Sequence, residues 1–109
     1  MLSSADGVVA PHHPSWSRPV HHLYVVRVAD RDHVQARLRE SGVGTGVHYP
    51  AIHLFKLYRG MGWKEGDFPH AEYAGRNILT LPLFPAMARA DVPRVVRALA
   101  SILRRHRKA

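Results

Sequence analysis

The pattern of apolar and polar positions divides the chain into alternating extended and helical segments. Residues 21–28 (HHLYVVRV) are β-branched, aromatic and apolar on both alternating faces, which predicts a largely buried strand. A second short strand is predicted at 45–49 (TGVHY), where Pro50 ends it by removing a ladder donor. A third extended segment is predicted at 78–85 (ILTLPLFP), which contains two prolines.

Helical periodicity is clearest near the C-terminus, where Asp91 is expected to cap a long helix. Its apolar positions follow the spacing i, i+3, i+4, i+7, i+10 and i+11, at Val92, Val95, Val96, Leu99, Ile102 and Leu103. Another amphipathic helix is predicted between Asp30, as its cap, and Gly42, which ends it. Shorter helical segments are predicted over 53–60 and from Pro69 onward.

The order of these segments predicts an α+β fold. We expect a two-layer sandwich in which helices pack on a small, mostly antiparallel three-stranded sheet. Residues 1–20 show neither helical nor strand periodicity, so they are predicted to be an irregular lead-in to one domain over 21–109. His12 and His13 lie in this lead-in without two further ligands at suitable spacing, and no metal site is predicted.

The charge balance is strongly basic. Lys and Arg outnumber Asp and Glu by 16 to 8, which gives a net charge of +8 and would attract polyanions or phosphorylated ligands. The basic residues gather at 31–39 and 94–107, on predicted helix faces, where simple solvation accounts for them. Because the aromatic and glycine spacing of common RNA-binding modules is missing, nucleic acid is not an expected partner.

Other classes are excluded by composition. The chain has no cysteine, which removes disulfides, thiol nucleophiles and cysteine-ligated zinc. Its apolar runs are interrupted within a few residues, so no membrane span of roughly 20 apolar residues is expected. The first residues lack the basic and apolar regions of a secretory signal, and a cytoplasmic location is therefore expected.

Polar aromatic residues end the predicted strand 45–49. His48 and Tyr49 stand there, and His53 follows closely. From the residues alone, a half-buried pair bonded to the backbone explains His48 and Tyr49 at least as well as a binding site does. The next aromatic and charged side chains either line a pocket or pack with their charges in solvent; they are Tyr58, Arg59, Trp63 and Lys64.

Five motifs occur in an informative order: HLYVVR, GTGVHYP, IHL, YRGMGWKEGDFPHAE and LTLPLFP. Because it carries these motifs in this order, the chain from about His21 to beyond Met87 resembles the C-terminal region of the DegT/DnrJ/EryC1/StrS aminotransferases, which are also called the sugar aminotransferases. That family usually has Pro-Leu-His after its His-Tyr-Pro, whereas this chain reads Ala51, Ile52, His53.

The resemblance implies the small domain of a pyridoxal-phosphate enzyme of fold type I, which transfers an amino group, usually from glutamate, to a keto sugar linked to a nucleotide. The family is dimeric, and its cofactor lysine lies in a large domain. Lys56, Lys64 and Lys108 are the only lysines here, and none has the family's cofactor-lysine setting. The resemblance therefore implies no catalytic or cofactor-binding residue in this chain, which is expected to be inactive alone.

By the same resemblance, His48 and Tyr49 are expected to contact the nucleotide-sugar substrate, with His53 as a weaker candidate. The expected partners are a large pyridoxal-phosphate-binding domain supplied in trans or a second copy of the chain. The alternative is a non-catalytic binding module whose basic surface holds nucleotide-sugars, an acidic partner or nucleic acid. Only the net charge supports that alternative. The charge also has another explanation, because an excess of 13 arginines over 3 lysines is expected from a genome that favours arginine codons.

Overall fold

A three-stranded antiparallel sheet in the order β1-β2-β3 forms the centre of the molecule. This computed structural model describes residue 2 and residues 5–109. The strands are β1 (Val8–Val9), β2 (Tyr24–Val28) and β3 (Ile78–Leu81). In the central strand, Val26 stands opposite Leu79 of β3, and both side chains are completely buried.

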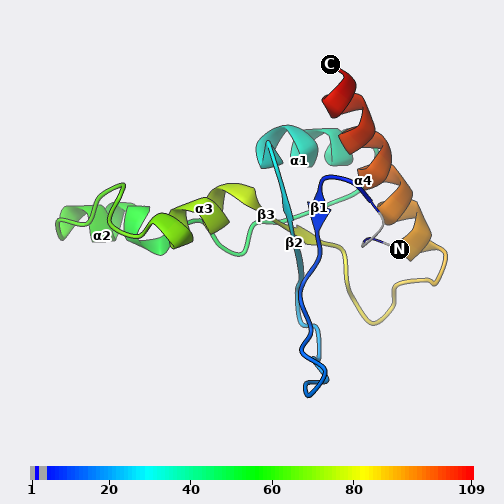
Figure 1. Ribbon diagram of the computed structural model, residues 1–109, viewed down its shortest axis with the longest axis horizontal. Helices are drawn as coiled ribbons and strands as arrows, with labels where there is room; N and C mark the ends of the chain where they lie inside the picture. Colours follow the sequence, from blue (N-terminus) through cyan, green and yellow to red (C-terminus); the bar gives the residue numbers. More distant parts are fainter. Residues whose placement is uncertain (1, 3–4) are drawn as a thin grey trace.

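The helices form two groups, one on each side of the sheet in the view of Figure 1. Their bounds are α1 (Arg31–Glu40), η2 (Ile52–Leu54, a 3-10 turn), α2 (Lys56–Gly60), α3 (Pro69–Asn77) and α4 (Asp91–Lys108). Helices α1 and α4 lie together, whereas α2 and α3 extend away as an arm (Figure 1). None of the helices in the described part of the chain is long and apolar enough to cross a bilayer.

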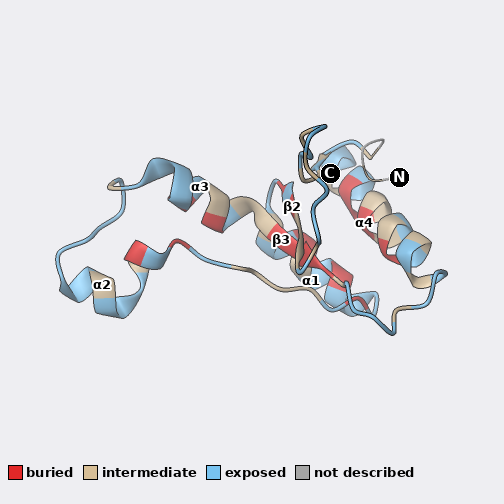
Figure 2. Cartoon of the chain, turned by 90° about the horizontal axis from the view of Figure 1, so that it is seen from below, coloured by how far each residue is buried: buried red, intermediate tan, exposed pale blue. Residues whose placement is uncertain are grey.

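The core lies between one face of the sheet and the pair α1 and α4. Strand alternation directs Val26 and Val28 of β2, and Leu79 and Leu81 of β3, into this layer. Helix α4 adds four members of its predicted stripe, Val95, Leu99, Ile102 and Leu103. Figure 2 shows the buried residues concentrated on these elements, and the predicted α+β class with a small antiparallel sheet is confirmed.

The arm makes the molecule extended. Its radius of gyration is 15.5 Å, against roughly 13 Å for a compact domain of this length. Exposed apolar side chains are numerous on the arm: Ile52, Leu57 and Met61 keep 55%, 64% and 65% of their surface exposed. The arm therefore presents several apolar side chains to solvent.

The prediction of a strand at 45–49 is wrong. Only Gly46 forms a bridge to Thr80 of β3, and residues beyond it leave the sheet. The reason lies in α3, where Gly75 packs directly against the backbone of Pro50 and Ala51. A chain held against α3 at that point cannot continue along the edge of β3.

The third strand comes instead from the predicted lead-in. Val8 and Val9 pair with Val28 and Arg27 of β2, so the expectation of an entirely irregular backbone over 1–20 is wrong there. Two residues are too short a strand to produce detectable alternation. The strand predicted at 21–28 begins only at Tyr24, and the division between 1–20 and 21–109 stays a prediction.

The two predicted aspartate caps have different outcomes. Asp30 is the N-cap residue of α1, as predicted, but in a left-handed conformation (φ 49°) its carboxylate makes no cap hydrogen bond and lies 3.2 Å from Nε2 of His106. The prediction for Asp91 is wrong: Asp91 is the first residue of α4, after the N-cap Ala90, and its side chain accepts a hydrogen bond from the backbone N–H of Ala88.

Candidate functional site

A hollow of about 620 Å³ lies between the segment 48–53, α2 and α3. Besides that segment, it is lined by Tyr58, by Trp63 and Phe68 of the following loop, and by Ala71 and Ala74 of α3. We call it the arm hollow. Its volume falls within the roughly 300–1,000 Å³ of small-molecule sites, and its wall is mainly apolar with a few polar groups, as such sites require.

His48 is held at the edge of the arm hollow by a side chain of the sheet. Its Nδ1 lies 2.8 Å from Oγ1 of Thr80, on β3. Sequence reasoning had a backbone partner as one alternative for this histidine, but its partner is a hydroxyl that is itself buried. His48 is thus half-buried and anchored, with its ring part of the wall of the hollow.

Tyr49 is more exposed than His48. Its side chain keeps 64% of its surface accessible, and its ring stands edge-on to that of His48, with centroids 5.1 Å apart. The phenol is therefore available at the mouth of the arm hollow, as both a donor and an acceptor of hydrogen bonds.

His53 has a different environment. Only 8% of its side chain is exposed, and its Nε2 lies 3.1 Å from Oε2 of Glu72, which is 3% exposed. The structure thus brings all three predicted substrate-contact residues to the wall of one hollow. One ring nitrogen of His53, however, is already engaged by a buried carboxylate.

Glu72 organises the loop that closes one side of the arm hollow. Its Oε1 accepts a hydrogen bond from the backbone N–H of Gly66 at 2.8 Å, and its Oε2 accepts one from that of Phe68 at 3.0 Å. The bond from Gly66 is the main cause that lowers the pKa of this carboxyl below its ordinary value; burial opposes it, and the bonds from Phe68 and His53 add to it.

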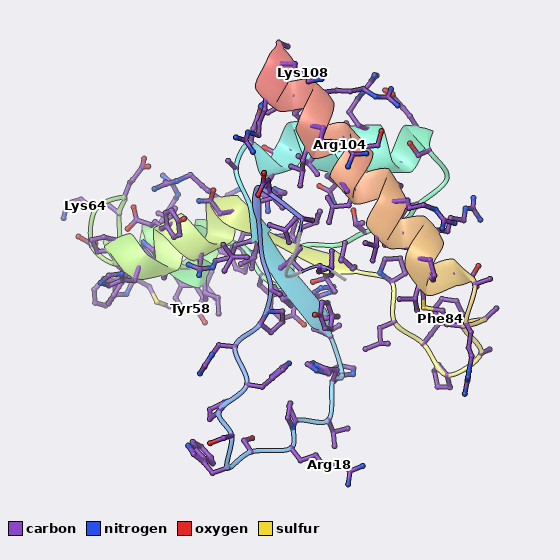
Figure 3. All side chains as sticks on the ribbon, turned by 45° about the vertical axis from the view of Figure 1, so that its right-hand side comes forward. Arg18, Tyr58, Lys64, Phe84, Arg104 and Lys108 are labelled. Carbon is purple, nitrogen blue, oxygen red and sulfur yellow. The ribbon has the colours of Figure 1, made fainter. Side chains whose placement is uncertain are left out.

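Aromatic rings continue the wall from His53 outward. The Phe68 ring lies 4.9 Å from that of His53 and 5.3 Å from that of Trp63, measured between centroids. Of the four residues predicted as pocket lining or surface packing, Tyr58 and Trp63 line the hollow. Arg59 instead bonds to the carbonyl of Leu54, and Lys64 pairs with Asp67 at 3.1 Å. Figure 3 shows Tyr58 and Lys64 on the arm, far from α4.

Sequence reasoning did not single out Thr80, Glu72 or Gly75. The sequence held a signal for Glu72. The acid of a capping box stands three residues after the N-cap of a helix, and Glu72 stands four residues after Phe68, the N-cap of α3. Its bond to the backbone N–H of Phe68 is the reciprocal half of that motif. Thr80 had no such signal, since its partner lies 32 residues away in sequence.

A second hollow, of about 370 Å³, lies between the loop after α1 and the start of α4. Its wall includes Phe84, Asp91 and Arg94, and none of the predicted substrate-contact residues reaches it. In the described residues, histidines and carboxylates form no group of three or more that could hold a metal ion. The arm hollow is therefore the hollow that brings the predicted substrate-contact residues together with a mainly apolar wall.

Residues 1–100 match the sequence model of the DegT/DnrJ/EryC1/StrS aminotransferase family. The chain is 38% identical over 100 residues to the pleiotropic regulatory protein of Geobacillus stearothermophilus, and 35% identical over 99 residues to the erythromycin biosynthesis sensory transduction protein EryC1 of Saccharopolyspora erythraea. These matches cover 91% and 90% of the chain, but it spans only 27% of the length of either relative.

Solved structures give the same result. DesV of S. venezuelae superposes with a TM-score of 0.85 at 35% identity, over 92% of this chain and 27% of that one. The aminotransferase TlmJ of Streptoalloteichus hindustanus gives 0.81 at 33%, over 94% and 28%. Spr1654 of Streptococcus pneumoniae, in its pyridoxal-phosphate form, shares the fold with a TM-score of 0.85 at 21% identity, over 93% and 27%.

Proposed function

Because the chain belongs to the DegT/DnrJ/EryC1/StrS aminotransferase family, we propose that it acts as the C-terminal small domain of a nucleotide-sugar aminotransferase. The chain spans 27% of the length of the two relatives named above. In this proposal, a large domain corresponding to the rest of their length supplies the other part of the enzyme. In this proposal the complete enzyme transfers an amino group from glutamate to a keto sugar carried by a nucleotide. The chain alone does not transaminate.

The gathering of His48, Tyr49 and His53 around the arm hollow is the observation that carries this proposal. These three residues were predicted as substrate contacts from the resemblance alone, and their place in the wall of one hollow supports the proposal. The imidazole of His48 and the phenol of Tyr49 offer hydrogen bonds on rigid rings, which suits sugar hydroxyls and phosphate oxygens. His53, already bound to Glu72, contributes the floor of the site beneath them.

The cofactor of the family, pyridoxal phosphate, supplies an electron sink for amino transfer when it is bound. The residues of this chain do not fit the task of holding it. Its three lysines are Lys56, Lys64 and Lys108, and none lines the arm hollow. Lys64 is engaged with Asp67, and Lys108 lies at the far end of α4 (Figure 3). We therefore assign the cofactor lysine to the large domain.

The exposed apolar side of the arm supports contact with that large domain. Ile52, Leu57 and Met61 each keep more than half of their side-chain surface exposed, next to the hollow. A surface of this kind is typical of an interface. Docking there would place His48 and Tyr49 against the reacting end of the substrate and exclude water from it. A second copy of this chain, bound through the same surface, is the alternative partner.

Reconstitution tests the proposal. A purified large domain from a family member is mixed with this chain, and glutamate-dependent amination of a keto-sugar nucleotide is measured. We expect activity in the mixture that neither component has alone. Leu57→Lys should abolish the gain by disrupting the exposed apolar surface, whereas Val20→Lys, at a more exposed apolar position outside the arm, should not. A mixture no more active than the large domain by itself would refute the proposed function.

A second candidate function, binding of polyanions, is favoured by one observation. Arg94, Arg97, Arg104 and Lys108 fall on one side of α4 at helical spacing, opposite its apolar stripe. Among the described residues, no carboxylate lies within 4.0 Å of these four side chains. If this basic side of α4 binds a polyanion, the affinity must fall steeply as the salt concentration rises. Binding that does not depend on salt would exclude this second function.

A further inference from the structure

We propose that Thr80, together with Gly46, is a positioning residue that fixes the ring of His48 so that its Nε2 is the nitrogen presented to the arm hollow. This inference rests on the proposed function, because it assigns a role to residues behind the proposed substrate contact. It concerns residues that act through His48 and do not touch the substrate themselves.

The position of Thr80 follows from strand alternation. Its neighbours Leu79 and Leu81 point into the core with 0% and 5% exposure, so Thr80 points to the opposite face of β3, toward the arm. Its backbone N–H and carbonyl are both bonded to Gly46, at 2.8 Å and 3.1 Å. Both backbone polar groups of Thr80 are thus held by Gly46, and its Oγ1 lies 2.8 Å from Nδ1 of His48.

Gly46 provides the second constraint on the same ring. A Cβ atom at this position would lie 2.8 Å from Cε1 of His48, closer than real Cβ contacts allow. Since the φ angle of Gly46 is not in the left-handed region, the backbone itself does not require glycine here. What requires it is the space that the imidazole occupies. The ring is therefore fixed by a hydrogen bond at Nδ1 and by close packing at Cε1.

Because Nδ1 is engaged by Thr80, Nε2 is the ring nitrogen without a hydrogen-bond partner among the described residues, and it is the one that can meet a ligand. A partner at one nitrogen of a histidine fixes the orientation of the ring and so the position of its other nitrogen, as in metal and catalytic sites. The hydroxyl of Thr80 is suited to this task because it can donate or accept, whichever the bound substrate requires. Pre-ordering of the ring also reduces the conformational entropy lost on binding.

The sequence offers matched variants for a test. Thr80→Val removes only the hydroxyl, in a strand that favours valine. Gly46→Ala adds only a methyl group against the tip of a side chain, which can swing away without disturbing the backbone. Thr45→Val and Gly44→Ala are the controls, because Oγ1 of Thr45 has no hydrogen-bond partner among the described residues and a Cβ at Gly44 would meet nothing within 4 Å.

The first measurement is made on the chain alone, by correlating ring nitrogen and carbon-bound proton signals of its histidines. The His48 signals are assigned by their loss in His48→Asn. We expect Thr80→Val and Gly46→Ala to shift these signals, or to broaden them through ring exchange, while the amide spectrum of the sheet is preserved. Thr80→Ser and the two controls should retain the wild-type signals. Unchanged His48 signals in Thr80→Val would overturn the inference.

The second measurement uses the reconstituted enzyme. Thr80→Val and Gly46→Ala are expected to raise KM for the keto-sugar nucleotide by roughly three- to tenfold, the range for loss of one ordered hydrogen bond, with kcat little changed. Thr80→Ser should restore the wild-type KM. Shifted His48 signals with an unchanged KM would also overturn the inference. If the reconstituted wild type is inactive, the proposed function fails, and the ring signals still decide whether Thr80 positions His48.

Discussion

Nε2 of His53 lies 3.1 Å from Oε2 of Glu72, and the two side chains are the most deeply buried polar contact of the arm. The same carboxylate accepts hydrogen bonds from the backbone of Gly66 and Phe68. Glu72 therefore connects η2, the loop after α2 and the start of α3. Since the core lies elsewhere, between the sheet, α1 and α4, this contact stabilises the walls of the hollow and not the core of the fold.

Removal of the Glu72 charge should loosen the arm. Glu72→Gln places an amide N–H₂ among groups that are themselves donors, so at least one of the bonds to Gly66, Phe68 and His53 is lost. We expect a fall in Tm of several degrees and faster amide exchange in the loop after α2. Glu65→Gln is the control, because Glu65 pairs with Arg76 at the surface and its loss should leave Tm nearly unchanged.

The same carboxylate should make stability depend on pH. The pKa of Glu72 is lower in the folded chain than its ordinary value of 4.5, chiefly because of the N–H of Gly66. The contribution of the ionised Glu72 to the free energy of unfolding is therefore complete when the pH is above the ordinary pKa, and it is lost as the pH falls through the pKa of the folded chain. The difference in Tm between wild type and Glu72→Gln should be largest near pH 6 and should shrink as the pH is lowered below 4. A difference that stays constant over this range would contradict the assignment.

The contact between α3 and the segment 48–53 depends on Gly75. A Cβ there would lie 2.7 Å from the backbone nitrogen of Ala51 and 3.3 Å from two backbone atoms of Pro50. Gly75→Ala should therefore reduce the free energy of unfolding by about 1–2 kcal/mol, although alanine favours helices. Gly60→Ala in α2, where a Cβ would meet nothing within 4 Å, should be neutral or stabilising by up to about 1 kcal/mol. Urea denaturation measures both; equal effects would contradict this packing.

The proposed substrate contacts predict a change in binding more than in fold. In the reconstituted enzyme, His48→Asn and Tyr49→Phe should each raise KM for the nucleotide-sugar by roughly three- to tenfold. Tyr73→Phe is the matched control, since Tyr73 is a comparably exposed tyrosine on α3 that does not line the hollow. Equal KM values for Tyr49→Phe and Tyr73→Phe would remove Tyr49 from the site.

Local pattern was enough for the elements that form the core. The β-branched and aromatic run around Val26 predicted a buried strand, and the stripe ending at Leu103 in α4 predicted buried positions because its period matches a helix. Val92, the first position of that stripe, lies in the first turn of α4 and is instead 46% exposed. The failures at 45–49 and at Val8–Val9 share a feature: the strand pairing that forms, and the packing that prevents it, involve residues distant in sequence.

The site was predictable only in part for a similar reason. His48, Tyr49 and His53 were indicated by a resemblance between sequences, and not by their chemistry. The groups that hold them, Thr80 and Glu72, lie 32 and 19 residues from their histidines, so no local spacing connects them. Long-range hydrogen bonds of this kind become visible only when the chain is folded.

The measurement that tests the account most directly is a map of nucleotide-sugar binding on this chain. The chain is isotope-labelled, combined with an unlabelled large domain, and its spectrum is followed as the nucleotide-sugar is added. Our account predicts shifts concentrated at the arm hollow, on His48, Tyr49 and Trp63, with little change along α4. Shifts confined to Arg97 and Arg104 on the basic side of α4, or no shifts in an active mixture, would contradict it.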